Sequence, residues 1–253
     1  MKTILITGST GFIGINLSEQ LIGYSLLTPS REELDLSLQD YCEDFFIHNK
    51  PDVIVHSACC DNGCNVNVQM FLNIIRYKPK NCKLIYFGSG AEYQNTPYGL
   101  SKKIMNEIAQ NEPNVFNLRL YGVFGKYEDE NRRFLSVCCN SILDKKPIEI
   151  WDNIKFDYLW VNDLVNIVKW FIEHNPRYKD YDICTSNPIH LSDWADTLMH
   201  LVKEKTEVIL NRNLQRIYSG DNSRFLEECP FVFSQPEESL RNLYAYYKNL
   251  KSV

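Results

Sequence analysis

The sequence has little positive charge and no long apolar run. Lysine and arginine number 27, against 32 aspartates and glutamates, so the 253 residues carry a formal net charge of −5. Proteins that bind nucleic acids usually show a basic stripe, and because we find no such stripe we expect no nucleic-acid partner. A transmembrane helix needs about 20 apolar residues in succession. No segment comes near that length, so we expect no membrane span.

A second cluster of metal-ligating residues is also missing. The sequence has nine cysteines, and three of them fall in CCDNGC, residues 59–64. A structural zinc site generally needs a further Cys or His pair at a defined spacing. No such pair stands out, so we expect no metal and predict free, mostly buried thiols. No secretory segment precedes the cysteines, and we therefore expect a reducing, cytoplasmic location.

Strands and helices alternate in the first half of the sequence. Apolar, β-branched runs predict strands, and apolar residues at helical spacing predict the helices between them. The expected strands are 2–7, 24–29, 52–58, 83–89 and 115–122, and the expected helices are 12–22, 38–48, 65–76 and 98–110. This alternation predicts an α/β fold: a Rossmann, doubly wound parallel sheet with helices on both faces.

The second half is less regular. Helical spacing is found over 129–143, 162–174 and 237–250, and in the segment that follows Ser192, which we expect to be its N-cap. Short strands are expected at 147–151 and 157–161. We predict a dinucleotide-binding domain over residues 1–150 and a small mixed C-terminal substrate lobe over 151–253. Residues 155–175 are expected to return to the first domain.

A glycine-rich loop follows the first predicted strand. GSTGFIG places Gly8, Gly11 and Gly14 where the strand ends and the first helix begins. In this context the three glycines allow a tight turn, a close approach of a pyrophosphate and close packing of helix on strand. The free N–H groups of the helix N-terminus attract phosphate. We therefore expect a dinucleotide here, and the expected contacts include the other loop residues Thr10, Phe12 and Ile13.

The second predicted strand favours NADP(H) over NAD(H). An acidic residue about 20 residues beyond the glycines would bind the ribose 2′-hydroxyl of NAD. The strand instead ends in TPSR, with Ser30 and Arg31 at its tip. A guanidinium and a hydroxyl there suit a 2′-phosphate.

Five segments together resemble a known family. ITGSTGFIG, DVIVHSA, YGLSK, LRLYGVFG and FDYLWVNDL occur in the order found in extended short-chain dehydrogenase/reductases, the NAD-dependent epimerase/dehydratase family acting on nucleotide-sugars. REELDL, residues 31–36, resembles the NADP-using branch that includes GDP-fucose synthase. The resemblance implies that Asp35 and Leu36 lie near the adenine, that Ser57 and Ala58 line the cofactor, and that Leu120 and Tyr121 flank the nicotinamide. Relatives often pair through a four-helix face, which leaves a homodimer open.

The resemblance assigns the chemistry to Ser89, Tyr98 and Lys102. A tyrosine with its ordinary pKa of about 10 is a poor acid–base group. A lysine four residues further along the same helix is expected to lower that pKa, and Ser89 is expected to orient the substrate carbonyl. In the family this serine lies four residues before a tyrosine, here Tyr93. The short spacing from Ser89 to Tyr98 is therefore a deletion after Tyr93, which leaves the strand end and the helix start in place.

Two departures from the family narrow the reaction. Dehydratases carry Asp and Glu directly after the catalytic hydroxyl residue, and GDP-fucose synthase carries a cysteine two residues after it. Gly90 and Ala91 stand at these positions, and neither side chain can move a proton. Dehydration and double epimerisation by these routes are therefore disfavoured.

The residues expected to bind the phosphates of the substrate also differ from those of the family. Phe156 stands where relatives often have an arginine for the nucleotide phosphates. We consider Arg224, or the pair Arg132–Arg133, as its replacement for binding a nucleotide-diphosphate sugar.

Three functions are consistent with these residues. The first is an NADPH-dependent reductase of a nucleotide-activated keto-sugar, with a 4-keto group favoured, in surface polysaccharide biosynthesis. The second is a C4-type nucleotide-sugar epimerase with tightly bound NAD(P). The third is a non-catalytic dinucleotide-binding protein, although relatives of that kind usually lose the tyrosine or the lysine.

Overall fold

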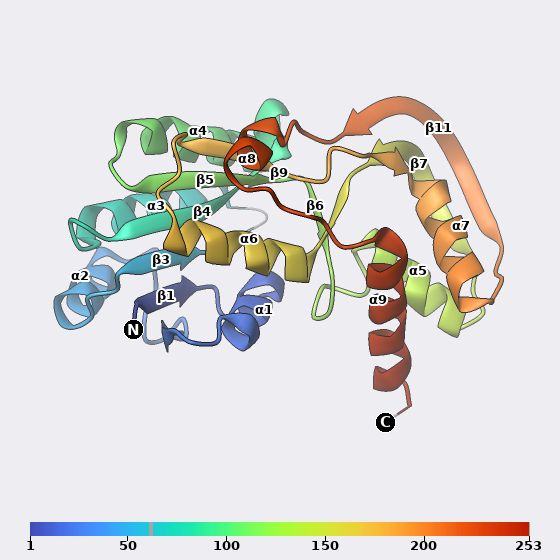
Figure 1. The fold of residues 1–253 in the computed structure, drawn as a ribbon, viewed down its shortest axis with the longest axis horizontal. Coiled ribbons are helices and arrows are strands. Elements are labelled where there is room, and N and C mark those ends of the chain that lie inside the picture. The colour runs from blue at the N-terminus through green and yellow to red at the C-terminus, as the bar shows by residue number, and fades with distance from the viewer. Residues whose placement is uncertain (61–62, 253) are drawn as a thin grey trace.

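A computed structural model describes residues 1–60 and 63–252 of the chain. Its centre is a six-stranded sheet in which every neighbouring pair of strands is parallel. In spatial order the strands are β2 (Ser25–Leu27), β1 (Thr3–Thr7), β3 (Val53–His56), β4 (Lys83–Ser89), β5 (Val115–Leu120) and β9 (Asp180–Ile183). The predicted α/β fold with a parallel, doubly wound sheet is confirmed (Figure 1).

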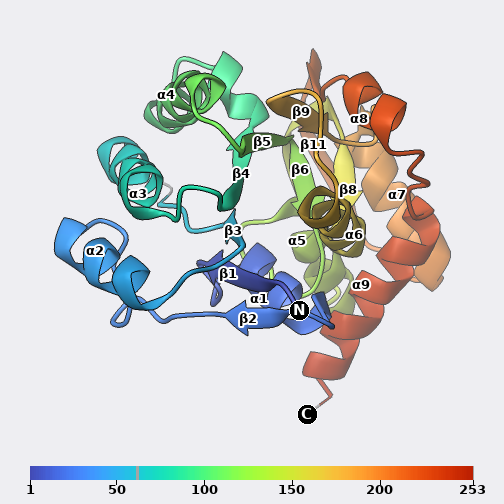
Figure 2. The same ribbon diagram turned by 60° about the vertical axis from the view of Figure 1, so that its left-hand side comes forward.

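Helices cover both faces of this sheet because its buried strands are apolar on both sides. In β1, Ile4 and Ile6 belong to one apolar cluster, whereas Leu5 between them belongs to another. The first cluster includes side chains of α1 (Phe12–Gln20) and α6 (Val161–Glu173). The second includes side chains of α2 (Gln39–His48), α3 (Cys64–Tyr77) and α4 (Pro97–Asn111). Figure 2 shows α2, α3 and α4 together on one side of the strands.

The direction in which strands are added to the sheet reverses between β1 and β3. From β1 the chain first adds β2 on one side, and it then crosses to the other side to add β3, β4, β5 and β9. Ligands of open α/β sheets bind outside the carboxyl ends of the strands at such a reversal. Those ends are Thr7, His56, Ser89 and Leu120 for β1, β3, β4 and β5. The fold thus brings the glycine loop and Ser89 to the same edge.

A smaller body packs beside this edge. It holds a three-stranded mixed sheet in the order β10 (Ile189–His190), β7 (Ile148–Phe156) and β11 (Val208–Tyr218). Its apolar cluster includes side chains of α5 (Phe134–Leu143), α7 (Leu191–Val202) and α9 (Pro236–Leu250). The strands β6 (Gly122–Phe124) and β8 (Tyr158–Trp160) form a parallel pair between the two bodies (Figure 1).

The chain passes between these bodies more than once. Helix α5 precedes residue 150 yet packs in the smaller body, whereas β9, α6 and α8 (Ser223–Glu228) follow it and pack with the main sheet. The division of the chain at residue 150 stays a prediction.

Several local expectations differ from the structure, and β9, β10 and α8 lie in segments for which no element was predicted. Residues 129–133 are not helical, because the Asp129 side chain accepts the N–H of Asn131 and favours a turn over a helix. Ser192 is not an N-cap: helix α7 begins at Leu191, and the Ser192 N–H and hydroxyl both bond to Asn153. Strand β11 was not predicted, because its sequence after Leu210 is mainly polar.

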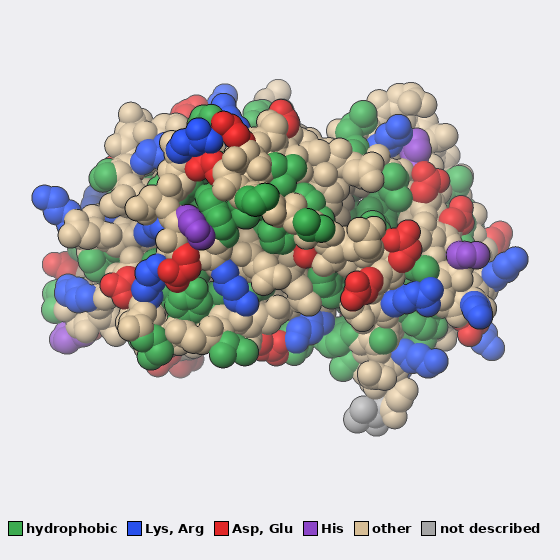
Figure 3. All heavy atoms as spheres, in the orientation of Figure 1, with side chains coloured by type: hydrophobic (Ala, Val, Ile, Leu, Met, Phe, Trp, Pro, Cys, Tyr) green, Lys and Arg blue, Asp and Glu red, His purple; other side chains and the backbone are tan. Residues whose placement is uncertain are grey.

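The surface carries charges of both signs. On the face in Figure 3, lysines and arginines are interspersed with aspartates and glutamates. Within residues 1–60 and 63–252, no helix is both long enough and apolar enough to cross a membrane. In the same described part of the chain, no three His, Cys, Asp or Glu side chains gather as they would around a metal ion. Of the CCDNGC segment, Asp61 and Asn62 lie outside the described residues.

Candidate active site

Two cavities lie at the carboxyl edge of the main sheet. One has a volume of about 460 Å³ and is lined by the glycine loop and the segment after β2. The other, of about 510 Å³, is lined by the ends of β3, β4 and β5, by α4 and by β11. Ser57, Ala58 and Cys59 line both cavities. The two cavities are therefore halves of one cleft, which we call the adenosine half and the reaction half.

The glycine loop is shaped by contacts that a side chain would destroy. Gly8 has a φ of +67°, and a Cβ there would lie 2.6 Å from the Ala58 nitrogen. A Cβ on Gly14 would lie 2.1 Å from the Gly8 carbonyl oxygen. A Cβ on Gly11 would instead meet only that same oxygen, at 3.4 Å. The fold thus requires glycine at 8 and 14, whereas at Gly11 the missing side chain leaves room for a ligand.

The adenosine half contains the residues expected to select the dinucleotide. Arg31 is largely exposed, and its Nε donates a 3.1 Å hydrogen bond to Asp35. Hydrogen bonds from Ser37 and the Arg31 guanidinium hold the pKa of the Asp35 carboxyl below its ordinary value despite partial burial. The Ser30 hydroxyl accepts the N–H of Glu33. A serine and an arginine therefore stand at one end of the cavity.

The structure brings most of the predicted cofactor residues to the cleft. The adenosine half is lined by Gly8, Thr10, Gly11, Ser30, Arg31, Asp35, Leu36, Ser57 and Ala58. The reaction half is lined by Phe12, Ile13, Ser57, Ala58, Lys102 and Leu120. Gly14 is buried and lines neither half, because it lies inside α1 against Gly8.

Ser89 and Tyr98 are positioned by a strand end and a helix start. Ser89 closes β4, and its hydroxyl accepts the Ala91 N–H at 3.2 Å. Thr96 caps α4, accepting the Gly99 N–H at 3.0 Å, and Pro97 takes the first helical position, where its missing N–H costs nothing. The short segment between Tyr93 and Tyr98 therefore places Tyr98 in the first turn of α4, facing the reaction half.

Lys102 lies one turn further along α4 and is almost completely buried. Its Nζ lies 5.5 Å from the centre of the Tyr98 ring and donates a 2.9 Å hydrogen bond to the Phe87 carbonyl. Burial, together with the nearby Lys102 ammonium, lowers the pKa of His56 to about 3. His56 is thus neutral, and its Nδ1 lies 2.8 Å from the Thr7 hydroxyl.

Tyr98 holds its proton firmly in this cleft. Burial raises the pKa of the Tyr98 phenol well above its ordinary value, Cys59 adds to the rise, and a hydrogen bond with Ser89 opposes it. A protonated phenol beside a serine hydroxyl is suited to donate a hydrogen bond, and then a proton, to a carbonyl oxygen.

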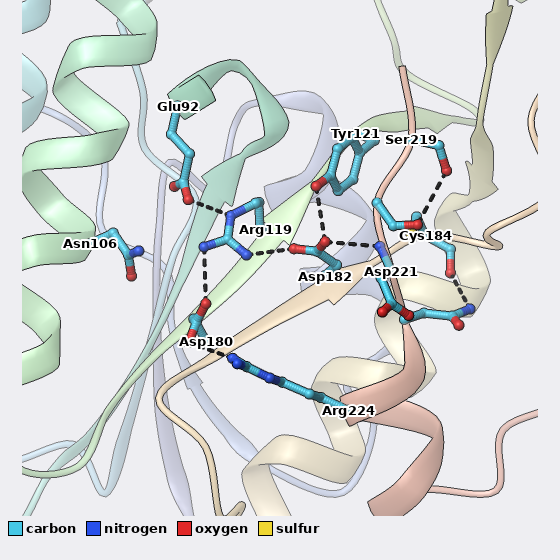
Figure 4. Close-up of polar contacts among 12 residues, drawn as sticks. Glu92, Asn106, Arg119, Tyr121, Asp180, Asp182, Cys184, Ser219, Asp221 and Arg224 are labelled. Atoms are coloured by element: carbon cyan, nitrogen blue, oxygen red, sulfur yellow. Dashed lines mark hydrogen bonds and ion pairs between the residues drawn. The ribbon is translucent and has the colours of Figure 1, made fainter. Parts of the chain in front are cut away.

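The substrate end of the cleft is only partly as expected. Tyr121 and Arg133 line the reaction half, and so do Arg132 and Phe156. Arg224 lines neither half of the cleft: its guanidinium lies 3.1 Å from Asp180 (Figure 4). It also lies over the Tyr178 ring.

Two residues of β11 were missed by sequence reasoning. Arg216 and Tyr218 both line the reaction half, and the Tyr218 hydroxyl lies 3.5 Å from the Ser89 hydroxyl. Residues two apart in a strand share a face, so the i, i+2 spacing would have paired them had β11 been recognised.

A buried ionic cluster supports this end of the sheet. Arg119 on β5 contacts the carboxylates of Glu92, Asp180 and Asp182 (Figure 4). Tyr121 donates a 3.0 Å hydrogen bond to Asp182. The cluster fixes Tyr121 through Asp182 and holds Glu92 on Arg119.

Comparisons with known proteins agree with this fold. The chain is 23% identical over 222 residues to GDP-L-colitose synthase of Yersinia pseudotuberculosis, covering 68% of this chain and 72% of the relative. The fold superposes on dTDP-glucose 4,6-dehydratase of Bacillus anthracis in complex with NAD, with a TM-score of 0.86, 16% identity and coverage of 100% and 98% of the two chains. It also superposes on GDP-L-fucose synthetase of Naegleria fowleri bound to NADP, with a TM-score of 0.84, 16% identity and coverage of 100% and 95%.

The family model described as the NAD dependent epimerase/dehydratase family matches residues 4–184. This span holds the glycine loop and the residues Ser89, Tyr98 and Lys102. The chain therefore belongs to the NAD dependent epimerase/dehydratase family and is an NAD(P)-dependent enzyme.

Proposed function

We propose that the protein is an NADPH-dependent reductase of a nucleotide-activated 4-keto sugar that serves surface polysaccharide biosynthesis. One observation carries the proposal. Ser89, Tyr98 and Lys102 meet in the reaction half, next to the glycine-loop cavity, whereas Gly90 and Ala91 beside them offer no second acid or base. A site that lacks the acid–base residues of dehydratases and of double epimerases suits a single ketone-to-alcohol conversion.

The adenosine half fits an NADP(H) molecule. Gly11 leaves room for the pyrophosphate at the start of α1, and Ser30 and Arg31 would hold the 2′-phosphate. Asp35, Leu36, Ser57 and Ala58 would line the adenine and the middle of the cofactor. When bound, NADPH would supply the hydride.

Ser89, Tyr98 and Lys102 would transfer the proton to the ketone oxygen. Ser89 donates a hydrogen bond to the ketone oxygen and holds it next to Tyr98. The Tyr98 phenol gives its proton to that oxygen as the carbon is reduced, and because burial raises the pKa of this phenol, the step depends on stabilisation of the phenolate. Lys102, fixed by the Phe87 carbonyl, stabilises the phenolate that remains.

Three arginines would hold the nucleotide diphosphate. Arg132, Arg133 and Arg216 all line the reaction half, and charge-assisted bonds from guanidinium groups suit phosphate oxygens. They would replace the arginine that relatives often carry at the position of Phe156. GDP-L-colitose synthase and the NADP-bound GDP-L-fucose synthetase support a GDP-linked sugar as the first substrate to examine.

The test is NADPH oxidation with a panel of 4-keto nucleotide-sugars. We expect one mole of NADPH consumed per mole of alcohol formed, and we expect Tyr98→Phe to lower the rate by about 10²- to 10⁴-fold. Tyr93→Phe is the matched control, because Tyr93 is 70% exposed and lies outside the cleft lining. Isomerisation of a sugar without net NADPH consumption would replace the proposal with the C4-type epimerase.

A further inference from the structure

A second phenol lies beside Ser89 in the reaction half. Tyr218, the last residue of β11, has its hydroxyl 3.5 Å from the Ser89 hydroxyl. A hydrogen bond with the Ala91 N–H also lowers its pKa, although burial raises that pKa more. The Tyr218 hydroxyl of the smaller body and the Ser89 hydroxyl of β4 thus lie side by side in the reaction half.

The ring of Tyr218 is held from two sides. Its centre lies 5.0 Å from that of Phe156 and 5.4 Å from that of Tyr121. The Tyr218 hydroxyl is therefore presented at a defined place.

The backbone of Tyr218 is also fixed. Its carbonyl accepts the Asp157 N–H at 3.1 Å, and the Asp157 side chain accepts hydrogen bonds from Ser219 and Thr185. Asp157 is fully buried. These contacts join the ends of β7 and β11 to the segment after β9, so the position of Tyr218 does not depend on a mobile loop.

We propose that Tyr218 determines specificity by hydrogen-bonding the substrate oxygen on the ring carbon beside the ketone. This inference rests on the proposed function, in which Ser89 and Tyr98 bind the ketone oxygen itself. The two oxygens of an α-hydroxy ketone lie about one hydrogen-bond length apart. A hydroxyl 3.5 Å from Ser89 stands at a matching distance for the second oxygen.

The contact between the Ser89 and Tyr218 hydroxyls leaves Tyr218 able to form a hydrogen bond with a sugar hydroxyl. A separation of 3.5 Å is at the outer limit for a hydrogen bond between hydroxyl groups, so giving it up costs little. A phenol can donate and accept at once. A sugar hydroxyl beside the ketone therefore completes the bonding of Tyr218, whereas a deoxygenated carbon leaves a partly buried phenol unpaired.

The substrate class follows from this pairing. The site prefers a nucleotide-linked 4-keto sugar that keeps a hydroxyl on the neighbouring carbon over one that is deoxygenated there. Arg216, two residues before Tyr218, lies on the same face of β11 and also lines the reaction half. A strand rises about 3.3 Å per residue, so one strand offers a cation to the diphosphate and a phenol to the sugar roughly 6–7 Å away.

The experiment uses two GDP-linked 4-keto-6-deoxyhexoses, one with a hydroxyl at C3 and one without. Reduction with NADPH is compared between the wild type, Tyr218→Phe and Tyr158→Phe. Tyr158→Phe is the matched control, because this ring also packs on Phe156, with 4.6 Å between ring centres, but lines a different cavity. We expect Tyr218→Phe to lower kcat/KM about 10- to 100-fold for the hydroxylated sugar and to leave the deoxy sugar within about twofold.

Other results would overturn the inference. An equal loss of kcat/KM with both sugars in Tyr218→Phe would mean that Tyr218 supports the site without contacting the C3 hydroxyl. No loss with either sugar would mean that Tyr218 neither contacts the hydroxyl nor supports the site. Tyr158→Phe should behave as the wild type does with both sugars. The same selective loss in Tyr158→Phe would count against Tyr218 as the contacting group.

A binding measurement separates this inference from the proposed function. Calorimetric titration of the corresponding GDP-6-deoxyhexoses, with and without the C3 hydroxyl, needs no turnover. If the wild type prefers the hydroxylated sugar and Tyr218→Phe does not, the role of Tyr218 stands even if no NADPH is consumed. If the wild type binds both equally, or binds neither, the role of Tyr218 is overturned.

Discussion

Arg119 and Asp182 form a buried ion pair at the edge of the main sheet, and the same carboxylate holds the Tyr121 hydroxyl beside the reaction half. Arg119 also contacts Glu92 and Asp180, so a single guanidinium joins side chains from η1 (Gly90–Tyr93) and β9. Figure 4 shows this arrangement, with the guanidinium between the three carboxylates.

Removal of that guanidinium should destabilise the fold. Arg119→Met leaves buried carboxylates without their partner, a change that typically costs about 3–5 kcal/mol. Urea unfolding should show this loss in the free energy of unfolding. Arg224→Met is the control: it also pairs with Asp180, but its side chain is 53% exposed, and we expect a change below about 1 kcal/mol. Equal effects of the two substitutions would contradict a structural role for the buried cluster.

Gly11 and Gly14 should respond differently to alanine. A Cβ on Gly11 meets nothing closer than 3.4 Å, whereas one on Gly14 would lie 2.1 Å from the Gly8 oxygen. We therefore expect Gly11→Ala to keep the melting temperature within a few degrees but to weaken NADPH binding by about tenfold or more. Gly14→Ala should lower the melting temperature strongly. Calorimetry and fluorescence titration with NADPH measure both, and unchanged binding by Gly11→Ala would place the pyrophosphate elsewhere.

Arg31 should distinguish the two dinucleotides. Its Nε bonds to Asp35, and the rest of the largely exposed guanidinium faces the adenosine half. Arg31→Ala should weaken NADPH binding by about tenfold and should leave NADH binding nearly unchanged, because only NADPH carries a 2′-phosphate. The measurement is the ratio of the two dissociation constants. A parallel loss for both dinucleotides would show that Arg31 orders the segment after β2 and does not read the phosphate.

The parts of the cleft that the sequence predicted are those with local patterns. The glycine loop is recognisable because steric need fixes Gly8 and Gly14 at a set spacing after an apolar strand. Tyr98 and Lys102 are recognisable because they lie one helical turn apart on α4. In both cases the residues that form the feature are neighbours in sequence, so their spacing carries the information.

The parts that were missed depend on contacts between distant segments. Tyr218 meets Ser89 across 129 positions, and β11 carries polar residues along most of its length, so it has little strand character of its own. Arg224 was considered for the diphosphate from its neighbourhood in the sequence, but Asp180 holds it outside the cleft. Partners of this kind are set by tertiary packing, which spacing alone does not encode.

Substitutions of Arg216 and Arg224 should have different effects on nucleotide binding. Arg216 lines the reaction half, and Arg224 does not. Arg216→Gln should weaken the binding of a nucleoside diphosphate by about tenfold, since a charge-assisted contact to phosphate is lost, and Arg224→Gln should leave it unchanged. Titration calorimetry with GDP and UDP provides the measurement. A larger effect of Arg224→Gln would indicate that Arg224 binds the diphosphate, as first considered from the sequence.

Glu128 should make the stability of the protein fall as pH rises. This carboxyl is buried and accepts a hydrogen bond from Ser136, while its Oε2 has no hydrogen-bond partner among the described residues. Burial raises its pKa from an ordinary 4.5 to about 7. Between these two values the native state holds a proton that the unfolded state has released, so the free energy of unfolding declines with increasing pH.

Glu128→Gln should abolish this decline, because the amide resembles the protonated acid and does not titrate. Relative to the wild type, the variant should gain stability on the order of 3 kcal/mol between pH 4.5 and pH 8. Glu130→Gln, an exposed change in the same turn, is the control and should follow the wild-type profile. Urea unfolding at several pH values measures all three proteins. A wild-type profile that Glu128→Gln leaves unaltered would mean that this carboxyl is ionised in the native state, and another buried group would then have to account for the pH dependence.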